Sequence, residues 1–344
     1  MAYSFRATTP IDVERLAAFL RRAFGMPEGA PQFDLDSLLW KYWFPRDDWH
    51  GSRSYVLEKD GQIEAHCALL PVTYRSTHGR AVAAHFIDWA ADPRSMGAGV
   101  RVLRKVATLT EMLCAVGGSE DTRKILPLIG FRPAGEMALF ACPVRPLRQA
   151  VTHQYRNWKL PLRLIRNALW SRSALGGGAP GWSFEPTTPD RVPPDLWSPP
   201  PTERAVRERS PSLYPYYLAC PSHRFRLFLI SHQGRPAGCC LIGFYRGQAR
   251  IADLWLQDES PESYEDAYRV TLLASMTDPS VAEVVASTSD PSQQKALSRS
   301  GFREFRRDPI VTLPHRGLPA HGLDCQMLDN DSTFLATESP AYLT

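Results

Sequence analysis

The segment Asp92–Gly99 has the composition of a loop that binds an anion. An alternating segment at 81–91 predicts a strand before it, and apolar residues with helical spacing follow it. Free N–H groups and the dipole at a helix start attract phosphates, while Gly97 and Gly99 let backbone approach a ligand. From Asp92 to Lys105 the net charge is +3, with one acid against Arg94, Arg101, Arg104 and Lys105. We therefore predict a phosphate-binding loop; the alternative is a glycine-rich turn that only starts a helix.

Four polar side chains on two predicted neighbouring strands could accept a proton from a reacting group. His85 and Asp88 directly precede the loop; His85 has a suitable intrinsic pKa, whereas Asp88 would need a raised one. Residues three apart on a regular strand lie on opposite faces, so only one of the two can face a substrate unless a bulge intervenes. Glu64 and His66 share a face of the adjacent strand and are second-line candidates. For each residue the alternative is a polar side chain on the wet face of a sheet.

The elements expected around the loop follow the order β-α-α-β-β-β-α-β-α-β. Thr9-Pro10-Ile11-Asp12 has the pattern of a helix start, with a capping Thr and Pro at the first helical position. Asp60-Gly61 is the signal of a tight hairpin turn. We predict strands at 3–8, 53–59, 62–74, 81–91, 112–116 and 133–142, and helices after Thr9, at 34–43, after the loop and at 119–129.

The chain contains an internal repeat. YSFRATTP at 3–10 and WSFEPTTP at 182–189 are identical at five of eight positions. Further matches follow in the same order: WKYWFP with YYLACP, DGQIEAHCALL with QGRPAGCCLIG, and Gly130-Phe131-Arg132 with Gly301-Phe302-Arg303. Ordered matches at nearly constant offset indicate two copies of one domain. We expect domains at 1–146 and 181–330, a basic, glycine-rich linker at 147–180 and a C-terminal tail at 331–344.

The linker is basic and interrupted by helix breakers. Its residues 151–175 contain no acid, and leucines alternate there with Arg156, Lys159, Arg163, Arg166 and Arg172. This composition is compatible with a helix on a membrane surface. Pro161 interrupts a long clean helix, so we favour the alternative of a helix packed between the domains with a solvated basic side.

The pattern Arg-x-x-Gly-x-Gly at 94–99, between a strand and a helix and upstream of Gly130-Phe131, resembles the acyl-CoA loop of the GNAT superfamily of N-acetyltransferases. The resemblance covers 1–146 well and the second copy more weakly. It implies an α/β (α+β) fold with two tandem GNAT-like domains, each a central mixed, mostly antiparallel sheet flanked by helices. Mycothiol synthase-like and FemAB-like enzymes have a similar tandem arrangement.

The resemblance also implies a reaction. An acyl-CoA, such as acetyl-CoA, would be the co-substrate, and a primary amine of a small molecule would attack its thioester directly. Its pantetheine arm would lie where the strand at 85–91 splays from the strand at 112–116, with His85 or Asp88 as base. The acceptor pocket would form near residues 40–49, which are rich in aromatic and charged side chains. The CoA-binding residues would be Trp89, Ala90, Ala91, Arg94, Ser95, Met96, Gly97, Ala98, Gly99 and Val100.

Two departures from the family pattern matter. Many GNAT enzymes place a Tyr four residues before the Gly-Phe pair to protonate the leaving thiolate, but this chain has Leu126 there and Leu297 in the second copy. A non-catalytic acyl-CoA-binding protein is therefore one alternative; a FemAB-like aminoacyl or peptidyl transferase is another, against which the intact loop argues. The counterpart of the loop at 256–270 lacks glycine, and its net charge is −4, five acids against Arg269. We thus expect only the first copy to bind CoA.

The composition excludes several other classes of protein. Of 344 residues, no run of about 18 is apolar, so we expect no transmembrane segment. A net charge of +4, without a basic patch interleaved with aromatics, argues against nucleic-acid binding. The seven cysteines are scattered without a CxxC pair, which favours reduced thiols, a cytoplasmic location and no bound metal.

Overall fold

The computed structural model describes residues 3–150, 158–199, 201–313, 322–337 and 342–344. Its first half confirms the predicted order of elements. These elements are β1 (Ser4–Ala7), α1 (Val13–Ala23), α2 (Leu35–Trp43), β2 (Ser54–Lys59), β3 (Gln62–Ser76), β4 (Gly79–Ala91), α3 (Ala98–Val106), β5 (Met112–Val116), α4 (Glu120–Ile125) and β6 (Arg132–Pro143).

Local signals account for two of these boundaries. The Thr9 N–H donates to Asp12 Oδ2 at 2.9 Å ahead of α1, which is half of the predicted capping arrangement. Between β2 and β3, Asp60 and Gly61 both have positive φ, 50° and 74°, as a two-residue hairpin turn requires.

The second half repeats this order after two linking helices, except that two 3-10 helices and the short strand β8 stand where the first half has α1. The linking helices are α5 (Pro146–Gln149) and α6 (Leu160–Leu175). The repeat contains β7 (Trp182–Thr187), β8 (Ala205–Arg207), α7 (Tyr214–Leu218), β9 (Arg224–His232), β10 (Arg235–Tyr245), β11 (Gln248–Leu256), α8 (Pro261–Ser275), β12 (Glu283–Thr288), α9 (Pro291–Arg299) and β13 (Arg303–Leu313). A C-terminal segment adds β14 (Leu323–Asp324) and the short 3-10 helices η7 (Met327–Asp329) and η8 (Asp331–Phe334).

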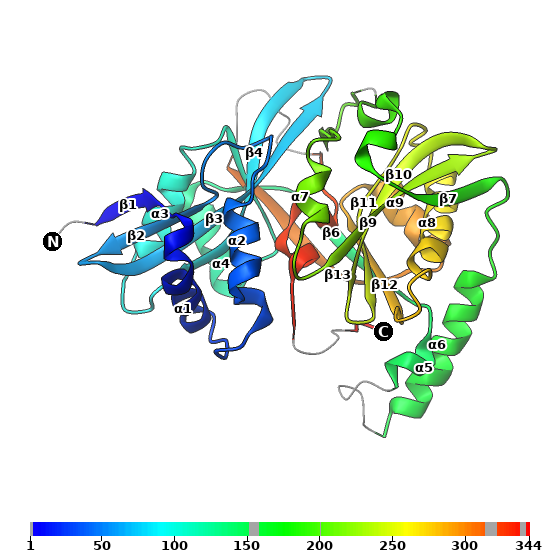
Figure 1. Cartoon of the computed structure of the whole chain (residues 1–344), viewed down its shortest axis with the longest axis horizontal. Coiled ribbons are helices and arrows are strands. Elements are labelled where there is room, and N and C mark those ends of the chain that lie inside the picture. Colours follow the sequence, from blue (N-terminus) through cyan, green and yellow to red (C-terminus); the bar gives the residue numbers. More distant parts are fainter. Residues whose placement is uncertain (1–2, 151–157, 200, 314–321, 338–341) are drawn as a thin grey trace.

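The two halves share one continuous sheet (Figure 1), whose main path runs β1-β2-β3-β4-β5-β13-β6-β12-β11-β10-β9-β7. Most neighbours are antiparallel, but β4 with β5 and β11 with β12 are parallel. In the middle, β13 pairs with β5 of the first half, and β6 pairs with β12 of the second. The last strand of each half therefore pairs with a strand of the other half.

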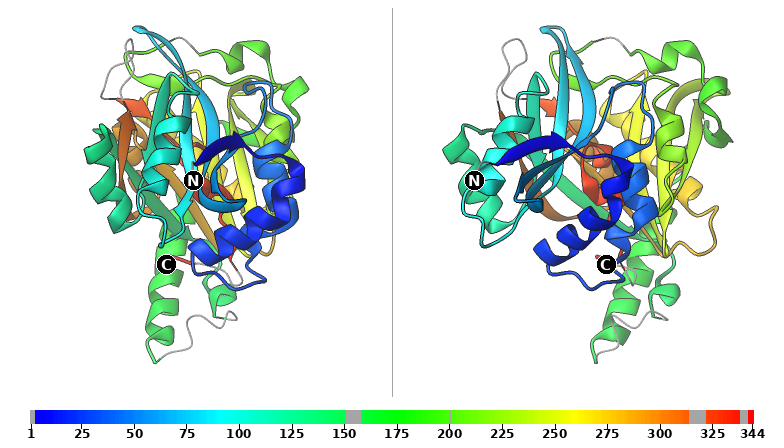
Figure 2. Two further views of the ribbon diagram at one scale, coloured as in Figure 1. Left: turned by 90° about the vertical axis from the view of Figure 1, so that its left-hand side faces the viewer. Right: turned by 60° about the vertical axis from the view of Figure 1, so that its left-hand side comes forward.

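Helices cover both faces of the first half of the sheet (Figure 2). Apolar residues of α3 pack with β2–β5 on one face, and those of α1 and α2 pack on the other face. The core under α1 and α2 continues into the second half through Tyr216, Tyr217 and Trp255. Trp40 and Tyr216, which are aligned positions of the repeat, stack on each other with ring centroids 4.6 Å apart. The two copies thus meet face to face through equivalent residues.

The linker helix contacts both copies of the repeat. α6 packs against β6, a strand of the first copy that lies in the second half of the sheet, and against α8 of the second copy, and with α5 it projects from the body (Figure 1). Pro161 does not interrupt it because this residue falls in the first turn, where no intrahelical N–H is needed. The C-terminal segment returns to the centre of the molecule, where Leu328 and Phe334 are buried in the core shared by both halves.

Candidate active site

A β-bulge at the end of β4 shapes the candidate site. His66 pairs with Ala90 and Ala68 with Ile87, so two β4 residues oppose a single residue of β3. Asp88, at φ 48°, is one of these two bulge residues. Ile87 packs under α1 and α2, and the Asp88 side chain also reaches α2. The bulge therefore brings His85, two positions before Ile87, and Asp88 to one face of the sheet.

A cleft opens where β4 and β5 part. The two strands pair only from Ala83–His85 to Met112–Cys114 and diverge beyond that point. The cavity here has a volume of about 610 Å³ and lies between the end of β4, the start of α3 and α4. Eight of the ten predicted CoA-binding residues line it: Trp89, Ala90, Ala91, Ser95, Met96, Gly97, Gly99 and Val100. Arg94 and Ala98 do not, because Ala98, the first residue of α3, is buried in the core beneath this helix and Arg94 points into solvent.

The start of α3 has the backbone geometry of an anion site. Gly97 caps the helix at φ 77°, a conformation that favours glycine. The first helical hydrogen bond from this turn is Arg101 N–H to the Gly97 carbonyl at 3.1 Å, so the N–H groups of Gly99 and Val100 have no partner from the helix's own ladder. The Trp89 indole N–H donates to the Gly99 carbonyl at 2.9 Å, and a Cβ on Gly99 would lie 3.3 Å from that of Ala91. Because Gly99 has no side chain, the start of α3 can pack closely against β4.

Within the loop, Arg94 is held by a neighbouring acid. Asp92 accepts hydrogen bonds from the Arg94 backbone N–H at 2.9 Å and from its guanidinium at 2.9 and 3.0 Å. These bonds lower the pKa of Asp92 to about 2. The loop is also tied to β3, because the Asp92 N–H donates to the Glu64 carbonyl and the Ser95 hydroxyl to the Glu64 carboxylate. Glu64, a second-line candidate for the base, is thus held by hydrogen bonds from the loop.

Asp88 is buried in a network of polar side chains. Its Oδ2 lies 3.0 Å from Lys41 Nζ and 2.7 Å from the Tyr42 hydroxyl, both on α2. Burial opposes ionisation, but the Lys41 ammonium and the Tyr42 hydroxyl lower the pKa of Asp88 below its ordinary value. The Asp88 carbonyl contacts His66 Nδ1 at 2.8 Å, and Ser54 contacts the other ring nitrogen at 2.9 Å. The network fixes the bulge from α2 and from β3.

His85 is also buried. Its Nε2 lies 2.8 Å from the Tyr74 hydroxyl, and within the described part of the chain its Nδ1 has no hydrogen-bond partner. Burial lowers the pKa of His85 to about 4, so the imidazole is neutral at neutral pH. His85 and Asp88 lie on strand β4 but are not among the residues that line the 610 Å³ cleft.

The structure adds one carboxylate that the sequence did not indicate. Asp331, which we assigned to a C-terminal tail, lies in η8 within electrostatic range of Asp88 and Lys41. Burial and the Asp88 carboxylate raise the pKa of Asp331 to about 6. Its segment is anchored nearby, since the Phe334 ring packs edge-on against Trp40 at 5.0 Å. No local pattern around Asp331 predicts this placement, because it depends on the fold of the whole chain.

The equivalent cleft of the second half is occupied by the chain itself. β11 and β12 pair only from Gln248–Ile251 to Glu283–Ala286. Beyond that point the Gln326 side chain accepts from the Leu254 N–H and donates to the Leu254 carbonyl, both at 2.8 Å. The C-terminal segment therefore uses the strand edge that a ligand in this cleft would meet.

Comparisons with known proteins agree with this architecture. No protein-family model and no curated protein matches the sequence. A GCN5-related N-acetyltransferase from Anabaena variabilis is similar in structure, with a TM-score of 0.58 and 12% identity over 90% of this chain and 72% of the other. A protein of the same description from Kribbella flavida gives a TM-score of 0.57 and 12% identity over 93% and 72%.

These likenesses, together with the β4 bulge and the parting of β4 from β5, show that the chain has the GNAT fold. Its arrangement is, more particularly, that of a tandem GNAT protein. A tandem GNAT protein from the clavulanic acid biosynthesis pathway matches with a TM-score of 0.55 and 12% identity, over 90% of this chain and 98% of the other. The predicted fold class is therefore confirmed.

The described residues lack two further kinds of feature. No described helix is long and apolar enough to cross a membrane. No group of three or more His, Cys, Asp or Glu side chains among them is placed to hold a metal ion.

Proposed function

We propose that the chain is an N-acyltransferase that transfers an acetyl or other acyl group from acyl-CoA to the primary amine of a small molecule. The observation that supports this most is the cleft between the end of β4, the start of α3 and α4. Free N–H groups at Gly99 and Val100 suit a pyrophosphate, and the cavity beyond them suits a pantetheine arm. In the second half the counterpart of the loop is acidic and the equivalent cleft is occupied by the C-terminal segment, so we expect one such site per chain.

In the proposed reaction the amine nitrogen attacks the thioester carbon, and a backbone N–H near Trp89 stabilises the developing oxyanion. The C–S bond then breaks, the acyl group stays on the nitrogen, and CoA leaves as a thiolate. One proton must move from the ammonium to a base and one must reach the thiolate. Leu126 is buried in the core under α3 and cannot supply the second proton, so water or the acceptor's own proton serves.

For the base we propose His85 or Asp88, which the bulge brings to one face of the sheet. His85 is supported by its neutral imidazole, whose buried Nδ1 has no hydrogen-bond partner in the described part of the chain. Asp88 is ionised, but Lys41 and Tyr42 already hold it, and Asp331 offers a carboxylate of higher pKa beside it. Alanine or asparagine at His85 and Asp88 in turn should lower turnover at unchanged acyl-CoA affinity for at least one residue; wild-type turnover in both would place the base elsewhere.

Binding is tested first by thermal shift with CoA, acetyl-CoA and longer acyl-CoAs. Gly97 is a poor site for a probe because its φ of 77° strains any side chain, whereas Met96 at the cleft is 92% exposed. Met96→Glu puts a negative charge beside the pyrophosphate and should weaken binding about fivefold or more, since exposed charges at this range repel by about 1 kcal/mol. Met96→Gln is the matched neutral control and should bind as the wild type does.

Catalysis is tested next with a panel of primary amines, assayed for free thiol. Acceptor-dependent thiol release supports the transferase, while binding without release supports a non-catalytic acyl-CoA-binding protein. Activity that requires an aminoacyl transfer RNA would support a FemAB-like enzyme. No stabilisation by any acyl-CoA, or equal stabilisation of wild type and Met96→Glu, would refute the proposed site.

We place the protein in the cytoplasm. All seven cysteines are buried and free, as in a protein kept in a reducing compartment.

A further inference from the structure

The linker helix α6 exposes an apolar stripe. Leu162, Ile165 and Leu169 are 65%, 59% and 67% exposed, and Trp158, just before the helix, is 78% exposed. The spacings of four, three and four residues place these side chains on one side of the helix, within about 60° for the three helical members at about 100° per residue. Such a continuous exposed stripe is unlike the scattered apolar residues of an ordinary surface.

The opposite side of α6 anchors it to the body. Asn167, Trp170, Ser171 and Ala174 are buried there. The Trp170 indole N–H donates to the Gly301 carbonyl, and the Ser171 hydroxyl donates to the Val144 carbonyl at 3.1 Å. The helix is thus held in place by one face while the stripe points away from the protein.

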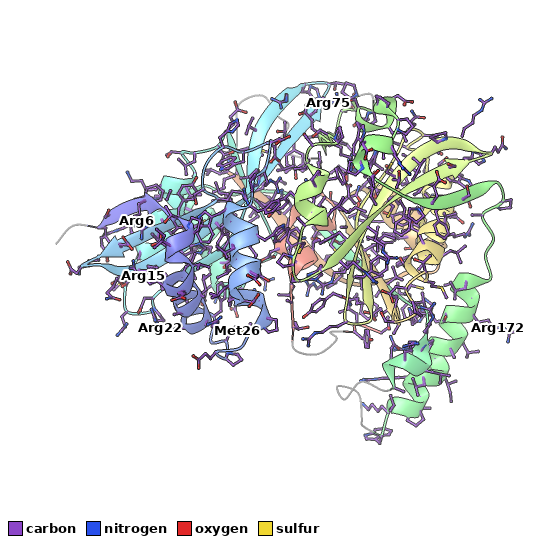
Figure 3. The ribbon with its side chains drawn as sticks, viewed as in Figure 1. Arg6, Arg15, Arg22, Met26, Arg75 and Arg172 are labelled. Atoms are coloured by element: carbon purple, nitrogen blue, oxygen red, sulfur yellow. The ribbon has the colours of Figure 1, made fainter. Side chains whose placement is uncertain are left out.

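The sequence around the stripe is strongly cationic. Exposed Arg166 and Arg172 fall on its two flanks, and Arg172 extends from the outer side of α6 (Figure 3). From Met137 to Phe184 the sequence contains no acid. Seven cations occupy the same span: Arg145, Arg148, Arg156, Lys159, Arg163, Arg166 and Arg172.

We propose that this face of α6 docks the protein onto an anionic lipid surface. An apolar stripe of Leu and Ile with Trp at one end inserts among the headgroups, while flanking Arg side chains meet the lipid phosphates. A second copy of this chain is a poorer occupant, because two such stripes would meet with cations on both flanks and no acid to pair them. The acyl-CoA cleft lies in the other half of the sheet, so docking leaves it open.

The test is flotation of the full chain with lipid vesicles at low salt. Phosphatidylcholine vesicles with about one third phosphatidylserine should carry the wild type, and pure phosphatidylcholine vesicles should not. Arg166→Glu with Arg172→Glu should lower the partition coefficient at least about 25-fold, at about fivefold per lost cation. Ile165→Glu should lower it at least about tenfold, because a charge replaces an inserted apolar side chain.

Ile11→Glu is the matched control, because Ile11 is 93% exposed and lies in the first half. It should float as the wild type does, and circular dichroism and thermal midpoints should show that every variant folds. Equal flotation of Ile165→Glu and wild type would overturn the proposal, as would the absence of flotation with anionic vesicles. A wild-type dimer that Ile165→Glu converts to a monomer would assign the stripe to a second copy instead.

Discussion

The buried pair of Lys41 and Asp88 allows a quantitative test of how the β4 bulge is held. Their side chains are 7% and 1% exposed, and Nζ lies 3.0 Å from Oδ2. Removing one partner of a buried pair leaves an uncompensated charge and typically costs about 3 to 5 kcal/mol. Lys41→Met removes the ammonium but keeps the apolar stem, and Asp88→Asn removes the carboxylate charge at nearly constant shape.

Each single variant should therefore lose about 3 to 5 kcal/mol of unfolding free energy. Asp88→Asn should be the milder, because Asp331 lies within electrostatic range of the Lys41 ammonium that is left behind. Lys41→Met leaves two carboxylates near each other and should be the harsher. The double variant buries neither member of the pair as an unpaired charge and should fall short of the summed losses by about 2 kcal/mol or more.

The assay is urea unfolding of the four proteins at one pH, with unfolding free energies from linear extrapolation. Additive losses would refute the reasoning, because they would mean that the two groups do not interact. The Lys41→Met variant also tests whether Asp88 is the general base. If Asp88 accepts the proton, Lys41→Met raises its pKa and moves the acid limb of kcat/KM to higher pH; a structural role alone leaves that limb unmoved.

Three further outcomes follow from the structure. Burial lowers the pKa of His66 and of His85 to about 4 and so holds both side chains neutral. Because the unfolded chain binds protons below about pH 6.5, the unfolding free energy from urea titrations should fall by up to about 3 kcal/mol per residue between about pH 6.5 and pH 4, and a flat profile would contradict this. Calorimetric titration with an acyl-CoA should give one site per chain, since Gln326 occupies the second cleft; a stoichiometry near two would be inconsistent with it. Limited proteolysis should cut first near Gly176–Gly181 and slowly in α6, and rapid cleavage within α6 would argue against its anchoring.

The sequence predicted the parts of the fold that rest on short-range signals. The capped start of α1, the Asp60-Gly61 turn and the glycines before α3 each act within a few residues, so their patterns can be read directly. The loop residues gather at the cleft for the same reason, since they follow one another on a strand, a turn and a helix start.

These short-range signals could not predict how segments far apart in the sequence pair with one another. The bulge at Asp88 arises from a shift in the register of β4 against β3, and only that shift brings His85 and Asp88 to one face. Asp331 reaches the same region because the chain returns to the centre of the molecule after β13. Neither the exchange of β6 and β13 nor the position of α6 leaves a local pattern, as both depend on which edges remain free once the halves assemble.

The exchange of strands gives the second half a structural role in the sheet. β5, which pairs with β4 before the cleft opens, is followed in the sheet by β13, which comes from the second half. Without that strand β5 would present an unpaired edge in the middle of a sheet and β6 would have no neighbour on its β5 side. We do not expect the second half to bind an acyl-CoA, because its counterpart of the loop is acidic and Gln326 occupies the strand edge of its own cleft. Its contribution to the proposed site is therefore structural: it completes the sheet beneath the cleft, and through its C-terminal segment it brings Asp331 near Asp88.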